Sequence, residues 1–105
     1  MKFDRISLDD ACTRDDKRRE PVSVVCEVRQ GTRPWQKARL EDLSRTGFRI
    51  GWLPGASTAH PLRIRIPGIQ ILSAQIRWKR ETAIGCEFAE PLNLYVFEHI
   101  VSQMR

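Results

Sequence analysis

The sequence lacks any long apolar run, and this absence excludes an integral membrane protein. No stretch approaches the roughly 20 apolar residues that a bilayer-crossing helix needs. The first thirteen residues contain Asp4, Asp9 and Asp10 and no apolar segment of the secretory type. We therefore expect no membrane insertion, a cytoplasmic location, and a mobile N-terminal arm over residues 1–13.

Residues that bind metals or perform covalent chemistry are also scarce. The three cysteines, Cys12, Cys26 and Cys86, include no C-x-x-C pair, so neither a disulfide framework nor a zinc site is indicated. The two histidines, His60 and His99, lack partners at ligand spacing. The sequence has no recognisable Ser/His/Asp set, no paired carboxylates in an apolar setting and no phosphate-cradling glycine loop. We predict a protein that is not an enzyme, with no metal, no cofactor and no catalytic residue.

Positively charged residues are in modest excess over negatively charged ones. Eighteen lysines and arginines against thirteen aspartates and glutamates give a net charge of +5 over 105 residues. An excess of this sign favours anionic partners, whether a nucleotide, a nucleic acid or an acidic protein surface, and does not choose among them. The length suits a single domain with one core.

Alternation of apolar and polar residues predicts six short strands. Turn residues separate them, and the predicted strands cover residues 22–29, 35–43, 48–52, 62–66, 72–79 and 84–88. The pattern places Cys26, Cys86, Trp52 and Trp78 on inward faces, and Arg49, Arg63, Arg65, Arg77 and Lys79 on outward faces. Six such strands predict an all-β fold, a six-stranded antiparallel β-barrel over residues 22–89.

The C-terminal segment changes its period. Apolar residues recur every four positions at Leu92, Val96, Ile100 and Met104, which predicts an amphipathic helix over residues 91–105. Pro91 suits the first turn of that helix. We expect the helix to dock on its own barrel rather than to bind a partner.

Two motifs are candidates for function. The first is Asp42-Leu-Ser44-Arg-Thr-Gly47, between the second and third predicted strands, and on its own it is explained by a polar turn. The second is the R-x-x-x-R spacing of Arg14 and Arg18, within a loop at residues 14–20 that also has the character of a solvated charged run. Arginine forks bind guanine edges and phosphate oxygens bidentately.

The two motifs together are far more specific. R-x-x-x-R followed by 23 residues and D-x-S-x-x-G resembles the paired signature of PilZ domains. Trp78 followed by Ile84-Gly85-Cys86-Glu87-Phe88 is similar to the closing hairpin of that family. The resemblance runs from Arg14 to the C-terminus, so residues 14–105 are expected to form the PilZ domain.

The resemblance implies a split barrel that binds cyclic di-GMP on its outside, through residues of both motifs. The implied ligand-binding residues are Arg14, Arg18, Asp42, Ser44 and Gly47, with Lys17, Arg19 and Arg45 as further contacts. In this scheme Arg14 and Arg18 contact guanine edges and phosphate, Asp42 and Ser44 hold guanine or ribose-phosphate groups, and Gly47 permits a close approach. Asp15 and Asp16 reduce the local charge between Arg14 and Glu20 to +1.

These observations predict a single-domain cyclic di-GMP receptor in a bacterial second-messenger pathway. Ordering of its arginine loop would transmit the messenger level to a downstream protein partner. The alternative is a PilZ interaction domain that binds no nucleotide and acts as a constitutive adaptor. Nucleic acid is a disfavoured partner because the predicted aromatic residues face inward, away from the outer arginines.

Overall fold

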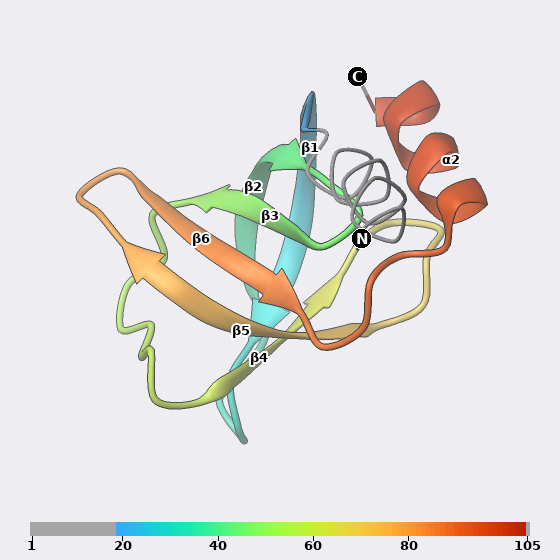
Figure 1. Ribbon diagram of the computed structural model, residues 1–105. Coiled ribbons are helices and arrows are strands. Elements are labelled where there is room, and N and C mark those ends of the chain that lie inside the picture. The colour runs from blue at the N-terminus through green and yellow to red at the C-terminus, as the bar shows by residue number, and fades with distance from the viewer. Residues whose placement is uncertain (1–18, 105) are drawn as a thin grey trace, which may run out of the picture.

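The computed structural model describes residues 19–104, which form a closed barrel followed by a helix (Figure 1). Neighbouring strands are antiparallel and follow the order β1-β2-β3-β6-β5-β4 around the barrel. The elements are β1 (Glu20–Arg29), β2 (Gln36–Leu43), β3 (Gly47–Gly51), β4 (Pro61–Arg65), β5 (Leu72–Lys79), β6 (Ala83–Phe88) and α2 (Leu94–Met104). The predicted six-stranded antiparallel barrel with a C-terminal helix is confirmed.

The barrel interior is filled by the apolar residues that alternate along each strand. Phe48 and Phe88 meet there with ring centroids 5.0 Å apart. Side chains exposed by 1% or less include Leu40, Leu43, Ile50, Leu62, Ile64 and Ile84. Burying each such side chain contributes about 1.5–3 kcal/mol, so the interior holds the barrel wall in a fixed shape.

Two cysteines lie in this interior, as the alternation predicts. Burial raises the pKa of the Cys26 thiol to about 11 and that of the Cys86 thiol to about 12, because a thiolate loses its hydration there. Both are free thiols. They act as small apolar side chains in the core.

Helix α2 lies at one end of the barrel and packs against β1 (Figure 1). It buries Phe97, Ile100 and Val101, so the amphipathic face docks on the barrel as expected. The helix begins at Leu94, three residues later than predicted, because Asn93 caps it. The Asn93 Oδ1 accepts a hydrogen bond from the Tyr95 N–H at 2.7 Å.

Two β-bulges change which side chains face outward. In β2 the register shifts between Leu40 and Asp42, and in β5 it shifts between Ile76 and Trp78. A bulge opposes two residues to one on the partner strand. The first therefore sets two carboxylates side by side on the outer face of β2, and the second turns Trp78 outward.

Two expectations about facing residues are corrected, those for Trp78 and Trp52, whereas Lys79 is exposed as predicted. Trp78 was predicted to be inward, but it pairs with Gly85 on the outer face and is half-buried. Trp52 was also predicted to be inward, but β3 ends before it and its side chain is 49% exposed. Lys79 follows the bulge and pairs with Ile84. Its ammonium donates to the Ala56 carbonyl at the end of the barrel.

Candidate functional site

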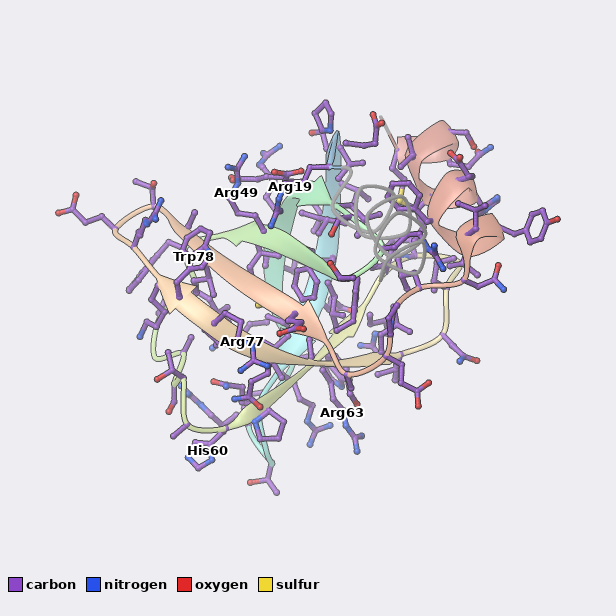
Figure 2. The ribbon with its side chains drawn as sticks, in the orientation of Figure 1. Arg19, Arg49, His60, Arg63, Arg77 and Trp78 are labelled. Carbon is purple, nitrogen blue, oxygen red and sulfur yellow. The ribbon has the colours of Figure 1, made fainter. Side chains whose placement is uncertain are left out.

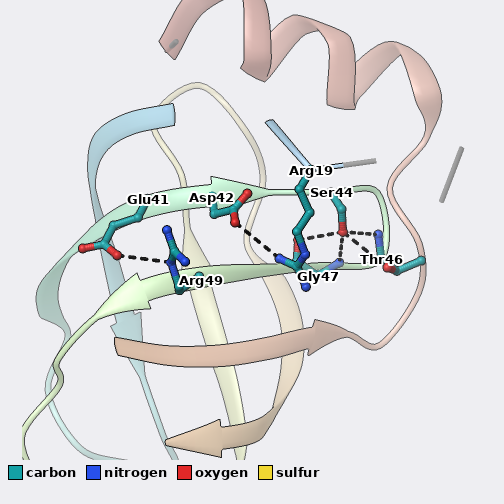
Figure 3. Close-up of polar contacts among 7 residues, drawn as sticks. All are labelled: Arg19, Glu41, Asp42, Ser44, Thr46, Gly47 and Arg49. Atoms are coloured by element: carbon teal, nitrogen blue, oxygen red, sulfur yellow. Dashed lines mark hydrogen bonds and ion pairs between the residues drawn. The ribbon is translucent and has the colours of Figure 1, made fainter. Parts of the chain in front are cut away.

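The D-x-S-x-x-G segment forms a tight turn between β2 and β3, and Ser44 is its centre. The Ser44 Oγ accepts hydrogen bonds from the backbone N–H groups of Thr46 and Gly47, at 3.3 and 3.1 Å (Figure 3). The Ser44 N–H donates to the Gly47 carbonyl at 2.8 Å. The side chain is nearly buried, with 2% of the residue exposed. In this structure Ser44 shapes the turn and does not face solvent.

Gly47 closes the turn against strand β6. A Cβ at this position would lie 2.3 Å from the backbone oxygen of Cys86. No side chain fits in that space, and the obstacle is backbone rather than a flexible side chain. Glycine is therefore required for β3 to pair with β6 at this point, where Gly47 opposes Glu87.

Asp42 occupies the outer end of β2, beside the bulge. Its side chain is only 16% exposed, and its Oδ2 lies 3.7 Å from the Nη1 of Arg19. Arg19, which is 56% exposed, reaches over the β2–β3 hairpin toward this carboxylate (Figure 3). A partly shielded carboxylate next to a movable cation is suited to exchange its partner for a ligand.

The neighbouring carboxylate, Glu41, has a different partner. Its Oε1 lies 3.3 Å from the Nε of Arg49, across from β2 on strand β3 (Figure 3). The Nε is shielded from solvent and makes no well-formed hydrogen bond within residues 19–104, because the angle of this ion pair is poor. Arg49 stands directly opposite Asp42 in the strand register.

The strand registers align these residues in one row across the outer wall. Asp42 opposes Arg49, Arg49 opposes Gly85, and Gly85 opposes Trp78. Three strand spacings make this row about 14 Å long. We call Asp42, Arg49, Gly85 and Trp78 the outer row.

Trp78 lies flat against the strand at the far end of the outer row. A Cβ on Gly85 would lie 2.1 Å from the indole ring, so only glycine allows the ring to rest on β6. The Arg80 guanidinium stands 4.6 Å from the indole centroid. The outer row therefore begins at a carboxylate and ends at an aromatic surface flanked by a cation.

The comparison with known families bears on this geometry. Residues 13–104 match the model of the PilZ domain. The chain belongs to the PilZ domain family. PilZ domains generally bind cyclic di-GMP, and they are binding or adaptor domains rather than enzymes. No curated protein matches the chain.

A metal site and a membrane-crossing helix were also looked for among the residues that the structure describes. Residues 19–104 contain no group of three or more His, Cys, Asp or Glu side chains arranged to hold a metal ion. Within the same residues, no helix has the length and apolar character that crossing a membrane requires.

The structure brings together part of the predicted site. Asp42, Ser44 and Gly47 lie on one hairpin, and Arg19 lies beside Asp42. Arg14, Lys17 and Arg18 lie outside the described residues, so their predicted contacts stay predictions. Arg19 precedes β1 directly, and Pro21 in β1 opposes Asp42. The chain that carries the R-x-x-x-R motif therefore enters the barrel beside Asp42.

Arg45 and Thr46 connect the same turn to the segment before α2. The Arg45 Nε donates to the Leu92 carbonyl at 3.0 Å, and the Leu92 N–H donates to the Arg45 carbonyl at 2.7 Å. The Thr46 carbonyl accepts from the Phe88 N–H at 2.8 Å. The D-x-S-x-x-G turn is thus tied to the chain that leads into the helix.

Sequence reasoning missed two members of the outer row. Arg49 was assigned to a solvated surface, and Trp78 was assigned to the core, with guanine stacking as the less favoured alternative for either Trp52 or Trp78. Arg49 could have been found by pairing the residues on either side of the Asp42–Gly47 turn, as in an antiparallel hairpin. Trp78 could not, because the bulge that turns it outward leaves the apolar alternation of Leu72, Ala74 and Ile76 unchanged.

Proposed function

We propose that this PilZ domain is a cyclic di-GMP receptor in the cytoplasm, and that the nucleotide lies along the outer row. The observation that carries the proposal is Asp42. This carboxylate is largely shielded, is paired with an exposed arginine, and stands at the end of a row that finishes at the half-buried indole of Trp78. No other outer position of the barrel combines these features within residues 19–104.

Guanine recognition by Asp42 follows from its hydrogen-bonding groups. The guanine amino group is a donor, and an ionised carboxylate accepts two such bonds in parallel. Arg19 holds the carboxylate at 3.7 Å, which is longer than a good charge-assisted bond. The exchange of Arg19 for guanine therefore costs little, and frees Arg19 for a phosphate.

The other motif residues take roles that fit this placement. Arg14 and Arg18 lie outside the described residues and precede Arg19 in sequence, and we expect their forks to contact guanine edges and phosphates. Ser44 and Gly47 position the hairpin rather than the ligand, because the Ser44 hydroxyl is used by the turn and Gly47 faces β6. This assignment replaces direct ligand contacts with a structural role for both residues.

Trp78 provides the stacking surface for a guanine base. Because base–aromatic stacking contributes about 1–3 kcal/mol per base, we expect Trp78→Leu to weaken cyclic di-GMP binding about tenfold. Trp52→Leu removes another exposed indole, one that lies outside the outer row, and should change affinity less than about twofold. Fluorescence titration of the purified variants measures both effects. Equal losses in the two variants would contradict the placement of the base on Trp78.

Arg45 is the residue through which binding reaches the helix. Its guanidinium holds the Leu92 carbonyl just before α2, and a phosphate near the Asp42–Gly47 turn competes for the same donors. Nucleotide binding then loosens the start of α2 and changes the surface that a downstream protein reads. The adaptor role rests on this step.

The helix connection has its own test. A hydrogen bond from a charged group contributes about 1.5–3 kcal/mol, so Arg45→Met should speed amide hydrogen exchange at the start of α2 about tenfold or more in the free protein. Cyclic di-GMP should produce a similar increase in the wild type and no further increase in the variant. An unchanged exchange rate in both proteins would exclude Arg45 as the link.

A further inference from the structure

One part of the outer surface of β1, β2 and β4, away from Glu41 and Asp42, is rich in positive charge. Five cations and one anion point outward in that part, a net charge of +4. Strand pairing brings them together, since β1 lies between β2 and β4. We call this surface the basic face, made of Val25, Glu27, Arg29, Lys37, Arg39, Arg63 and Arg65.

Repulsion between like charges on the basic face lowers the stability of the free protein. Arg29 and Arg63 stand directly opposite each other in the β1–β4 pair, and like charges in that relation destabilise a sheet. Arg63 and Lys37 form no ion pair within residues 19–104 and both are exposed. An anionic partner would relieve the repulsion and pair these cations.

An aromatic side chain holds part of the basic face in place. The Arg65 guanidinium lies 4.2 Å from the Trp35 centroid, and that of Arg29 lies 5.6 Å from it. Arg65 also donates to the Glu27 Oε1 from Nε and Nη2, at 2.9 and 2.8 Å. Two cations of the basic face therefore lie against one indole ring, which favours a fixed position for both guanidinium groups.

A cavity of about 390 Å³ opens on the basic face, between β1 and the turn that joins β4 to β5. Val25 and Ile69 are among its apolar lining residues, and Val25 is 53% exposed. Lys37, Arg65 and Glu27 also line it, and Glu27 is paired with Arg65. The cavity therefore combines an apolar surface with a positive charge from Lys37, which suits an apolar side chain next to a carboxylate.

We propose that the basic face binds an acidic segment of a partner protein, with one apolar side chain of that segment in the cavity. Carboxylates of the segment pair with Lys37, Arg39 and Arg63. Nucleic acid fits less well, because it presents no apolar side chain to the cavity. Arg63 projects from the side of the barrel away from Arg19 and Arg49 (Figure 2). The partner and a ligand on the outer row therefore occupy separate surfaces.

Selection from a displayed library of random short peptides tests this proposal without a known partner. Peptides retained by the wild-type protein should carry several acidic residues around an aliphatic or aromatic one. In a chosen peptide, replacing that apolar residue with Ala should lower affinity at least about tenfold, since burying one such side chain contributes about 1.5–3 kcal/mol.

The matched variants reverse two charges on different surfaces. Arg39→Glu/Arg63→Glu should abolish binding of the selected peptide while the barrel stays folded, because a carboxylate opposite Arg29 replaces repulsion with attraction. Arg77→Glu/Arg80→Glu makes the same charge change on β5 and its following turn, and should leave peptide affinity within about threefold. Cyclic di-GMP binding of the Arg39/Arg63 variant should equal that of the wild type, which separates this proposal from the nucleotide site.

The proposal would be overturned if the selection recovered no peptides that combine acidic residues with an apolar one. Equal loss of peptide binding in both double variants would also overturn it. So would a DNA duplex, or vesicles of anionic phospholipid, that binds more tightly than the peptide and displaces it. Affinity that depends on acidic residues but not on the apolar residue would also overturn it, because the cavity would then have no occupant.

Discussion

Asp42→Asn is expected to weaken cyclic di-GMP binding about 100-fold or more, while the barrel stays folded. The substitution keeps the shape of the side chain but removes the charge, and it places an amide donor where guanine also presents donors. Loss of a charge-assisted bidentate pair costs about 3 kcal/mol, which corresponds to this factor. Calorimetric titration of the wild type and the variant measures the change directly.

The adjacent carboxylate provides the control. Glu41→Gln makes the same chemical change one residue away, on a side chain that pairs with Arg49 rather than with Arg19. We expect a change of less than about fivefold, the scale of one exposed ion pair. If the two variants lose affinity equally, charge near the hairpin matters and Asp42 has no specific role in guanine recognition.

Gly47→Ala is expected to cause the largest loss of stability among the glycine substitutions. The added methyl group would meet the Cys86 backbone oxygen at 2.3 Å, so β3 and β6 must separate. Overpacking of this kind costs about 2 kcal/mol or more. For a domain of this size, that corresponds to a fall of roughly 8–16 °C in the Tm. Thermal unfolding followed by circular dichroism measures the shift.

A second glycine of the same strand gives the comparison. At Gly51 an added Cβ would meet its nearest neighbour, the Glu41 carboxylate, at 3.5 Å, which is ordinary contact. Gly51→Ala should therefore change the Tm by only a few degrees. A similar, small shift in both variants would show that the β3–β6 pairing tolerates a side chain at position 47, contrary to the geometry.

Much of the fold follows from alternation along the chain. The inward positions of Cys26, Ile50, Ile64 and Cys86 were all readable because each lies in a run of strict period two. The helix was readable because its apolar period changes to about four. The first residue of the helix could not be predicted in the same way. Asparagine and proline are both common near helix starts, and here Asn93 rather than Pro91 provides the cap.

The faces of individual residues were harder to predict where the strands carry bulges. One inserted residue reverses every later assignment on a strand, and no residue type marks the bulge reliably. Trp78 was reversed for this reason. Trp52 was misplaced for a different reason, because the strand ends at Gly51 and the alternation has no meaning beyond it.

For the candidate site, the motif located the hairpin but not the surface around it. Asp42 and the turn at Ser44 follow from local chemistry, since these side chains bond nearby backbone. Arg49 joins Asp42 across the β2–β3 hairpin, whereas Trp78 joins the row only through the pairing of β3 with β6, two strands that are distant in sequence. A single sequence contains no register, so the outer row becomes visible only in the folded barrel.

Calorimetric titration with cyclic di-GMP is the most direct test of the nucleotide receptor. The wild type should bind saturably at micromolar concentration or below, and the Arg14→Ala/Arg18→Ala variant should show no saturable heat at the same concentrations. Thermal unfolding of the two proteins should agree, so that lost binding is not lost folding. Absence of heat and of any thermal shift in the wild type at high ligand concentration would contradict the receptor, and would leave a PilZ domain that acts as a constitutive adaptor.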